Sequence, residues 1–394
     1  MKIFFICQRV PFPPDRGDKI TTYNEMKHLS ASHEVHVFCL ADGEKDLENV
    51  AGALGFARAV TAVPVTHWGT RLRALLALFT GKPLTVAMLR QAKLHSAVAQ
   101  TFAEVKPDLI FVYSSNTAQY AAPFAGVPRI MQFADLDSLK WRRYAERAKA
   151  PMRWIYALEA RRLLAYEKKI ARSFSHSLLC TDAEVRDFEA VVPGAPVSTV
   201  GNGVDLDYFR TKGAAKVAGS IVFTGLMDYL PNVDAVVWFC DAILPRVQAR
   251  IPSATFVICG NRPSAEVQRL VARPGVTVTG WVADVRPYLD AAEVFVAPLR
   301  IARGIQNKVI EALAMGLPVV SSTAAMNGTV IREGEGIVAS DDAGVFAQHV
   351  VRLLSDDDLR ADLARRARLA VERDYTWAAQ MVLLDRVIAE VTAG

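Results

Sequence analysis

The sequence predicts an α/β protein of two domains, each a parallel sheet covered by helices. Its 394 residues exceed the length of a typical single domain and are sufficient for two. Short apolar segments alternate with longer helical patterns throughout the chain, which indicates repeated strand–helix–strand units. Many of these segments are apolar at every position, as in Leu109–Val112 and Thr255–Cys259, which is typical of strands covered on both faces.

The predicted strands form two sets, separated by a polar, glycine-containing stretch at 205–219. The first set is expected at 2–9, 34–40, 108–114, 128–134, 176–181 and 197–201. The second set is expected at 220–225, 255–260, 276–280, 294–299, 318–322 and 336–340. Helical patterns follow at 341–354, 356–373 and 376–392. We therefore predict two Rossmann-like domains, 1–204 and 205–375, and a terminal helix over 376–394 that crosses back to the first domain.

Composition narrows the class of protein. A hydrophobic fraction of 52% predicts a folded chain, and a net charge of +5 is a mild bias toward anionic partners, too small for a nucleic-acid binder. The five cysteines form no C-x-x-C pair and several lie in apolar runs, which favours buried thiols over a zinc site or disulfides. The beginning of the chain lacks a signal-peptide pattern and no apolar stretch approaches the roughly 20 residues of a membrane span, so we expect a cytoplasmic protein.

The segment 296–318 is the most informative part of the chain. A helix is expected to start near Gly304, directly after a strand, and to end at Gly316. Gly304, Lys308 and Glu311 would then share one face of that helix. The site would follow the carboxyl end of a strand, which is where open α/β sheets bind ligands.

Three cations gather at this predicted helix start: Arg300, Arg303 and Lys308. The helix dipole is positive there, so each cation costs about 0.3–1 kcal/mol unless an anion is present. Lys308 also precedes Glu311, which is the less favourable order for a helical ion pair. We interpret the segment as a binding site for a phosphate or diphosphate. The alternative is a set of solvated charged side chains that contribute little to stability.

The same segment resembles the donor-binding stretch of GT-B-type glycosyltransferases, especially glycosyltransferase family 4. The pattern P-x-R…G-x-x-x-K-x-x-E-A-x-A-x-G-x-P-V-V runs from Pro298 to Val320. The resemblance implies that Lys308 meets the donor diphosphate, that Glu311 hydrogen-bonds the ribose, and that Gly304 lets the backbone approach the phosphates. It also implies two domains facing each other across a cleft, a nucleotide diphosphate sugar as donor, retention of configuration, and neither a metal nor another cofactor.

The chain departs from the family pattern at two points. Arg303 stands where many members carry the first of two glutamates, which often faces the transferred sugar. We expect a phosphate contact from Arg303 instead, and a catalytic role for Arg303 and Lys308 in stabilising the departing diphosphate. The turn 225–232 lacks the basic residue that the family commonly has there, and Arg300 with Arg303 is the proposed replacement. Val282 lies in a strand-turn resembling the frame of the donor's base, so it is a donor-binding candidate, with a place in the core as the alternative.

The first domain offers candidates at two predicted strand ends. Gly17 and Asp18 follow the first strand, in a loop that contacts donor phosphate or acceptor in the family that it resembles. Asp135 follows another strand and is a catalytic candidate to meet the acceptor or the reacting sugar, with a structural role as the alternative. Asp135 and Asp137 superficially match a D-x-D metal motif of a different glycosyltransferase fold, an interpretation that we reject because GT-B-type enzymes hold the diphosphate with cations and helix ends.

Two basic stretches contain interleaved aromatic and apolar residues: 140–172 and 68–79. Such stretches fit attachment to an anionic membrane surface. The alternative is a solvated helix that packs its apolar stripe on the domain. A lipid-linked glycan acceptor at the inner face of the cell membrane would account for both stretches.

Segments 11–19, 135–141 and 227–232 narrow the resemblance to the bacterial exosortase (PEP-CTERM) system-associated sugar transferases. This resemblance implies sugar transfer from a nucleotide diphosphate sugar to a glycan or lipid-linked acceptor in exopolysaccharide biosynthesis. Two alternatives remain open, a nucleotide-sugar epimerase of the same architecture and a non-catalytic sugar-nucleotide binder. A Rossmann dehydrogenase is disfavoured because no predicted strand is followed by G-x-G-x-x-G.

Overall fold

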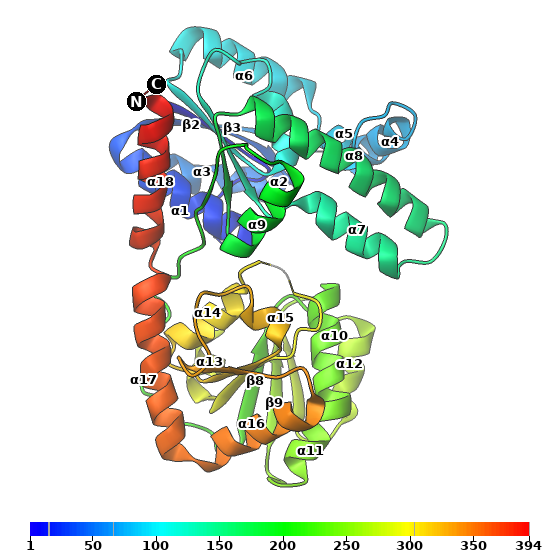
Figure 1. Ribbon diagram of the computed structural model, residues 1–394, viewed down its shortest axis with the longest axis vertical. Helices are drawn as coiled ribbons and strands as arrows, with labels where there is room; N and C mark the ends of the chain where they lie inside the picture. The colour runs from blue at the N-terminus through cyan, green and yellow to red at the C-terminus, as the bar shows by residue number, and fades with distance from the viewer. Residues whose placement is uncertain (15, 66, 303, 394) are drawn as a thin grey trace. The chain divides into compact units, whose positions relative to one another are not determined.

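The chain forms two compact units in a computed structural model that describes residues 1–14, 16–65, 67–302 and 304–393 (Figure 1). Unit 1 comprises Met1–Val200 together with Met381–Gly394, and unit 2 comprises Gly201–Gln380. Each unit contains one parallel sheet with helices around it, which confirms the predicted fold class. The chain leaves unit 1 after Val200 and returns to it at Met381.

Unit 1 has a seven-stranded sheet in the order β3-β2-β1-β4-β5-β6-β7, with every neighbouring pair parallel. Its strands are β1 (Lys2–Cys7), β2 (Glu34–Ala41), β3 (Ala59–Pro64), β4 (Leu109–Tyr113), β5 (Arg129–Ala134), β6 (His176–Leu179) and β7 (Val197–Thr199). The central strands β1 and β4 are almost entirely buried, because helices cover both faces of a parallel sheet.

One strand of unit 1 is absent from the sequence prediction. Strand β3 lies at the edge of the sheet, pairs with β2 alone, and has most of its residues only half buried. Its sequence, AVTAVP, includes two alanines and a proline, which are residues of low strand propensity. An edge strand of this composition gives no continuous apolar run, which is the pattern on which the prediction relied.

The helices of unit 1 connect successive strands and differ greatly in length. They are α1 (Gly17–Ser32), α2 (Glu44–Glu48), α3 (Val50–Leu54), α4 (His67–Ala77), α5 (Leu84–Met88), α6 (Ala92–Val105), the 3-10 helix η1 (Ser115–Tyr120), α7 (Asp137–Arg147), α8 (Met152–Ser173) and α9 (Asp182–Val191). Helices α7 and α8 pack against each other as a hairpin. The remaining helix, α18 (Trp377–Thr392), enters unit 1 from Met381 onward, where Asp385 accepts a hydrogen bond from His28 Nε2 at 2.8 Å.

Unit 2 has a six-stranded parallel sheet in the order β10-β9-β8-β11-β12-β13. Its strands are β8 (Ser220–Thr224), β9 (Thr255–Cys259), β10 (Val276–Gly280), β11 (Val294–Ala297), β12 (Val319–Ser321) and β13 (Ile337–Ala339). Strands β8 and β11 are neighbours at the centre, although the chain passes through β9 and β10 between them. Their carboxyl ends therefore lie side by side, at the point where the order of the strands reverses.

The helices and turns of unit 2 complete its core on both faces of the sheet (Figure 1). They are α10 (Leu230–Trp238), the π-helix η2 (Phe239–Ile243), α11 (Leu244–Gln248), α12 (Ala265–Arg269), the 3-10 helix η3 (Leu270–Ala272), α13 (Arg286–Ala291), α14 (Asn307–Ala314), α15 (Thr323–Met326), α16 (Ala343–Ser355) and α17 (Asp357–Asp374). Across the described part of the chain, no helix is both long enough and apolar enough to cross a membrane.

The predicted start of the helix after β11 is wrong by three residues. Helix α14 begins at Asn307, and Gly304 lies in the preceding loop with φ of 63°. That backbone conformation is left-handed, so Gly304 cannot belong to a right-handed helix and does not share a helical face with Lys308 and Glu311. The helix ends at Ala314, and Gly316 with φ of 66° follows it, as the sequence indicated for the other end.

Candidate active site

The candidate donor site of unit 2 is built on helix α14. Val309, Ile310, Ala312 and Leu313 are buried in the core of unit 2, which fixes how this eight-residue helix is turned. Lys308 and Glu311 are separated by about one turn on the opposite, half-buried side, so both occupy one face of α14. The structure thus brings these two predicted donor-binding residues together at the carboxyl end of the central strands.

The Lys308 ammonium lies between β8 and α10. Its Nζ is 4.6 Å from the centroid of the Phe223 ring, and it donates a hydrogen bond to Oδ1 of Asn232. A Cβ on Gly225 would stand 3.0 Å from the same Nζ and 2.7 Å from Nδ2 of Asn232. Glycine at position 225 therefore leaves the space that the ammonium and the amide occupy.

Burial perturbs both ionisable groups on this face of α14. It lowers the pKa of Lys308 to about 7, because the buried ammonium has lost most of its hydration. It raises the pKa of Glu311 to about 7 for the same reason, and each charge partly opposes the effect of burial on the other. An anion placed beside Lys308 would raise its pKa again, so the site is suited to a ligand that brings negative charge.

Backbone segments approach each other closely at two places in the loops around α14 and β8. A Cβ on Gly260 would stand 1.7 Å from the carbonyl oxygen of Gly225, so the loops that follow β8 and β9 touch through their backbones. A Cβ on Gly328 would stand 2.0 Å from the carbonyl oxygen of Gly304. No side chain fits at Gly260 or Gly328 without moving a backbone segment.

Arg300 does not stand as an unpaired cation beside Lys308. Its guanidinium donates to both carboxylate oxygens of Asp234 on α10, at 3.0 and 2.5 Å, and lies 5.4 Å from the Trp238 ring. The expectation that uncompensated arginines crowd the helix start is therefore wrong for Arg300, because a carboxylate from α10 neutralises it. Arg303 lies outside the described residues, so its predicted catalytic role stays a prediction.

The remaining donor-site candidates of unit 2 lie on loops. Val282 is half-buried in the connection between β10 and α13, and its neighbour Trp281 is 70% exposed. Trp281 is therefore not a core residue, which leaves the donor-binding interpretation of this turn as a prediction. Asn202, which belongs to the connector into unit 2, donates from Nδ2 to Oδ1 of Asn307 at 3.2 Å and so contacts the first residue of α14.

The predicted residues Gly17 and Asp18 of unit 1 form the first turn of α1. The Asp18 carboxylate accepts from Nη1 of Arg9 and from Nε of Arg16, each at 2.7 Å. Lys19 pairs with Asp46 at 2.9 Å. Asp18 thus holds two arginines at the carboxyl end of β1, and its own charge is compensated by them.

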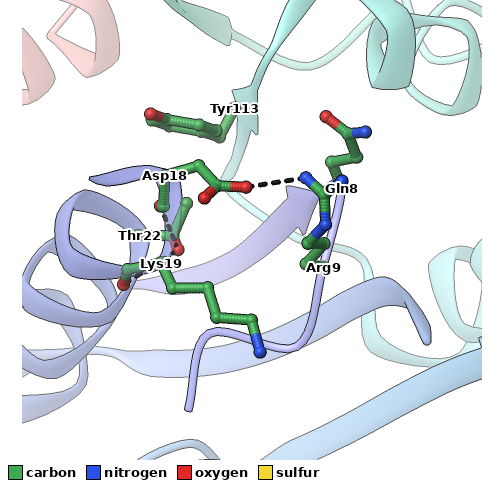
Figure 2. A pocket seen from close by; sticks show the side chains of 6 residues that line it. All are labelled: Gln8, Arg9, Asp18, Lys19, Thr22 and Tyr113. Carbon is green, nitrogen blue, oxygen red and sulfur yellow. Dashed lines mark hydrogen bonds and ion pairs between the residues drawn. The ribbon is translucent and has the colours of Figure 1, made fainter. Parts of the chain in front are cut away.

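These residues line a small pocket, which Figure 2 shows from close by. Gln8 and Arg9 reach it from the end of β1, Tyr113 from the end of β4, and Asp18 with Thr22 from α1 (Figure 2). The sequence interpretation gave Arg9 no role, although its position directly after a strand was a usable signal. The pocket has a mixed lining of carboxylate, guanidinium and amide, which suits a polar ligand with both donors and acceptors.

Asp135 follows β5 as predicted, at the start of a loop that leads into α7. It is half buried, and its charge together with that of Asp137 raises the pKa of Lys140, which pairs with Asp137 at 2.5 Å. Asp137 opens α7. Within the described residues, no group of three His, Cys, Asp or Glu side chains is placed to hold a metal ion.

A buried acid of unit 1 escaped the sequence interpretation altogether. Glu25 on α1 is 1% exposed, accepts from Nε2 of Gln132 at 3.3 Å, and its Oε2 has no hydrogen-bond partner. Burial raises the pKa of Glu25 to about 8, so this carboxyl is largely protonated at neutral pH. A glutamate inside a helical pattern gives no sign in the sequence that it points inward.

Comparisons with known proteins cover both units. The family described as "Glycosyl transferase 4-like domain" matches residues 19–203, and the family described as "Glycosyl transferases group 1" matches residues 218–356. The chain belongs to glycosyltransferase family 4, of the GT-B type. The two family-4 matches meet at the connector around 204–217, close to the division between unit 1 and unit 2.

Individual relatives of this family-4 protein are distant. It is 27% identical over 211 residues to a phosphatidyl-myo-inositol mannosyltransferase of Mycolicibacterium smegmatis, covering 51% of this chain and 54% of the relative. It is 31% identical over 125 residues to the lipopolysaccharide core biosynthesis glycosyltransferase LpsE of Rhizobium meliloti, covering 30% and 36%. The matched part of the chain spans about half the length of such curated relatives, or less.

Solved structures extend the likeness over the whole fold. HepE of Anabaena, crystallised with UDP-glucose, superposes with a TM-score of 0.70 at 16% identity and covers 99% of this chain and 100% of its own. At that identity the likeness establishes the GT-B fold of the family-4 protein and nothing finer.

Proposed function

We propose that this protein is a glycosyltransferase that moves a sugar from a nucleoside diphosphate sugar to a glycan acceptor. The observation that carries the proposal is the half-buried pair Lys308 and Glu311 on α14, at the reversal point of the unit 2 sheet. An ammonium held there by the neutral amide of Asn232 keeps its charge for a ligand. The UDP-glucose bound by HepE, which shares the fold, supports a ligand of this class.

In the proposed reaction, the bond between the anomeric carbon and the diphosphate breaks, and its electron pair stays on the departing diphosphate oxygen. The acceptor oxygen bonds to that carbon, and its proton passes to the departing diphosphate. The protonated Lys308 stabilises the negative charge that develops on the departing diphosphate. Glu311, one turn along α14, accepts hydrogen bonds from the ribose hydroxyls of the donor. Asp135 of unit 1 is the proposed catalytic group toward the acceptor, and Arg303 remains a proposed phosphate contact.

Finer features of the proposal rest on the family resemblance. We propose retention of configuration and independence from metal ions, and both can be measured directly. The product's anomeric configuration by proton NMR tests the first, and turnover in the presence of EDTA tests the second. Inversion, or loss of turnover that Mg²⁺ or Mn²⁺ restores, would refute the corresponding feature.

We further propose an acceptor that belongs to exopolysaccharide biosynthesis. A nucleotide-sugar epimerase is the less favoured alternative. The name of LpsE, a lipopolysaccharide core glycosyltransferase, supports an acceptor of the bacterial glycan class. Both family matches are to glycosyltransferases, so neither supports an epimerase. Incubation with a donor and no acceptor separates the two, because an epimerase converts the donor sugar while a transferase leaves its configuration unchanged.

The peripheral membrane contact that we propose is made by exposed apolar side chains of unit 1. Leu75 and Leu76 on α4 are 57% and 56% exposed, and Phe79 just beyond it is 85% exposed. Trp154, in the first turn of α8, is 69% exposed. Exposed basic residues stand close by in the sequence: Lys82, Arg142, Arg143, Lys149, Arg153 and Arg161. Exposed aromatic residues with basic neighbours match the chemistry of an anionic lipid surface.

Helix α8 is hydrogen-bonded to the segment that contains Phe79 and Lys82. Arg162 donates from Nη1 to the carbonyl oxygen of Ala77 at 2.9 Å and from Nη2 to that of Leu78 at 3.0 Å. Glu159 accepts from the backbone N–H groups of Leu84 and Thr85 at 2.5 and 3.0 Å. Figure 1 draws α4, α5 and the turn between α7 and α8 on the same side of unit 1. The inner membrane leaflet is the proposed partner because it carries anionic lipids.

Vesicle flotation tests the membrane contact. We expect the protein to float with phosphatidylglycerol vesicles and far less with phosphatidylcholine, and the double variant Phe79→Ser, Trp154→Ser to bind at least tenfold less. Leu369→Ser on α17, where the leucine is 55% exposed, is the matched control and keeps wild-type binding. Equal flotation with both lipids, or no loss in the double variant, would contradict this contact.

The donor proposal is tested by thermal shift with a panel of nucleotide sugars and free nucleotides. We expect one donor to stabilise the wild type selectively and the stabilisation to vanish in Lys308→Ala. Hydrolysis or transfer of that donor then separates an active transferase from the non-catalytic sugar-nucleotide binder that the sequence left open. A panel in which no nucleoside diphosphate or nucleotide sugar stabilises the wild type would overturn the proposal.

A further inference from the structure

The first turn of unit 2, between β8 and α10, has no basic residue to offer a diphosphate. It runs 225–229, and its one ionisable carboxyl, Asp228, lies 3.7 Å from the guanidinium of Arg262. The polar groups that this connection supplies lie on α10, which begins at Leu230. Two side chains of that helix, Asn232 and Asp234, each hold one cation of the β11–α14 segment.

The amide of Asn232 is fixed by two contacts. Its Nδ2 donates to the carbonyl oxygen of Leu226 at 2.8 Å, which leaves Oδ1 as the acceptor for Nζ of Lys308. The residue is 4% exposed, so water does not compete for these bonds. A Cβ at Gly225 would collide with Nδ2 at 2.7 Å, so the glycine of the turn is part of the same arrangement.

A neutral acceptor can hold the Lys308 ammonium without neutralising its charge, which a carboxylate cannot do. An ammonium has three N–H donors, and the Asn232 amide takes one of them without cancelling the positive charge. At the neighbouring position, Asp234 takes the guanidinium of Arg300 with both carboxylate oxygens and neutralises it. Helix α10 therefore positions one cation with its charge intact and the other with its charge compensated.

We propose that Asn232 is a positioning residue for the diphosphate site, holding the Lys308 ammonium in place by an uncharged hydrogen bond so that its charge is left for the ligand. This inference rests on the proposed function, and it names a residue that acts through Lys308 without contacting the reacting atoms. It accounts for the missing basic residue of the turn, because the cation reaches this point from α14 and α10 supplies its support.

The electrostatic surroundings of Lys308 make the proposal measurable. Glu311 on the same helix is the charged group that raises the pKa of Lys308. Of the nearby carboxylates, Asp234 on α10 is paired with Arg300, and Asp228 in the turn after β8 lies near Arg262. Strand β8 has the sequence SIVFT and so contributes no ionisable group. Burial lowers the pKa of Lys308, so the charged form is lost as pH rises past about 7, and diphosphate affinity declines with it.

Two substitutions at Asn232 should shift the pH at which diphosphate affinity declines, in opposite directions. Asn232→Asp places a negative charge beside Lys308, so the pKa of the ammonium rises and the decline in affinity begins at higher pH. Asn232→Ala removes the acceptor, so the pKa falls further and the decline begins at lower pH. We expect midpoints about one pH unit above and below that of the wild type, and affinity at pH 6 about tenfold weaker in both variants. In the first the carboxylate competes with the ligand, and in the second the ammonium is no longer held.

The experiment is isothermal titration of the full chain with UDP, GDP, ADP and inorganic pyrophosphate between pH 5.5 and 9, using whichever probe binds. Asn49→Asp in unit 1 is the matched charge-change control, with the affinity and pH midpoint of the wild type. Asn232→Asp is isosteric with the native residue and decides the matter if Asn232→Ala proves unstable.

The outcomes separate this inference from the proposed function. A wild type that binds none of the four probes refutes the proposed donor site itself. A wild type that binds, with Asn232 variants whose midpoint stays in place or moves in the same direction in both, refutes the role of Asn232 alone. Opposite shifts support it, because a purely structural loss at this position would lower affinity without moving the midpoint upward in the aspartate variant.

Discussion

The two units place charged side chains at the same kind of position and treat them differently. In unit 1, the two cations at the end of β1, Arg9 and Arg16, share the one carboxylate of Asp18. In unit 2, Lys308 at the end of the central strands is held by an amide. Burial shifts the pKa of an acid in unit 1, Glu25, upward and the pKa of a base in unit 2, Lys308, downward.

The difference between the buried acid and the buried base indicates which of the two sites would be stabilised by an anionic ligand. A buried carboxyl reduces its cost by keeping its proton, and it then needs no partner of opposite charge. A buried ammonium reduces its cost by losing its proton or by receiving an anionic ligand. In unit 1 the two arginines therefore already share a carboxylate, whereas in unit 2 the Lys308 ammonium is held by a neutral amide, so an anionic ligand would stabilise its charged form.

Removing the charge of Lys308 in unit 2 is expected to have the largest effect on activity. Lys308→Met should lower kcat/KM for the donor by 100-fold or more, about 3 kcal/mol, and flatten the pH dependence of binding between pH 6 and 8. Lys216→Met is the control, because burial also lowers the pKa of Lys216, whose Nζ donates to the carbonyl oxygen of Ala292. If both variants lose activity equally, a general loss of stability explains the result and the comparison fails.

Removing the uncompensated acid of unit 1 tests the other half of the comparison. The pKa of Glu25 rises from 4.5 to about 8 on folding, so the folded protein keeps a proton that the unfolded chain releases between these values. Its free energy of unfolding therefore falls as pH rises through this range. Glu25→Gln, which cannot ionise, should have a free energy of unfolding roughly 4 kcal/mol above that of the wild type at pH 8 and equal to it at pH 4.

Calorimetric melting at both pH values measures this gain. Glu104→Gln, which changes an exposed carboxyl on α6, is the control and should alter neither melting temperature. A gain for Glu25→Gln that is equal at pH 4 and pH 8 would mean that packing, and not a retained proton, distinguishes the two side chains.

Breaking the ion pairs of Asp18 in unit 1 should lower turnover more than it weakens nucleotide binding. Asp18→Asn releases Arg9 and Arg16 from their shared carboxylate, and we expect about tenfold lower kcat with UDP affinity changed by less than about threefold. Asp108→Asn is the control, because Asp108 lies at the amino ends of β1 and β4, where it accepts from the backbone N–H of Lys2. A large loss of UDP affinity in Asp18→Asn would instead make Asp18 the direct donor contact that the sequence predicted.

The smallest effect is expected at Arg300. Its charge is already shared with Asp234 and its side chain is 51% exposed, so Arg300→Ala should weaken UDP binding by about threefold. Titration calorimetry beside Lys308→Met gives the contrast. Equal losses in the two variants would show that compensation by a carboxylate does not distinguish the cations of this site.

Much of the fold could be predicted from the sequence, because apolar runs mark buried parallel strands directly. Strands such as β4 and β9 match their predicted ranges to within a residue. The edge strand β3 could not be predicted in this way, since half-buried alanines and a proline give no such run. The predicted start of α14 is too early because the sequence does not show that the backbone of Gly304 is left-handed; glycine also occurs at the start of helices.

The candidate site could be predicted only in part. Lys308 and Glu311 are three residues apart on one helix, so their proximity follows from helical periodicity. Asn232 lies 76 residues from Lys308, and Asp234 lies 66 residues from Arg300, so neither partnership has a local pattern. The sequence therefore indicated where cations gather, and the fold decides which of them is neutralised.

The return of the chain to unit 1 at Met381 has a consequence for synthesis. Residues from Met381 onward leave the ribosome after the whole of Gly201–Gln380, so unit 2 has all its residues available while unit 1 still lacks the segment that contains Asp385. During translation the domain begun first is thus completed second. A stop codon at position 381 would remove from unit 1 its share of α18 and leave unit 2 with all of Gly201–Gln380.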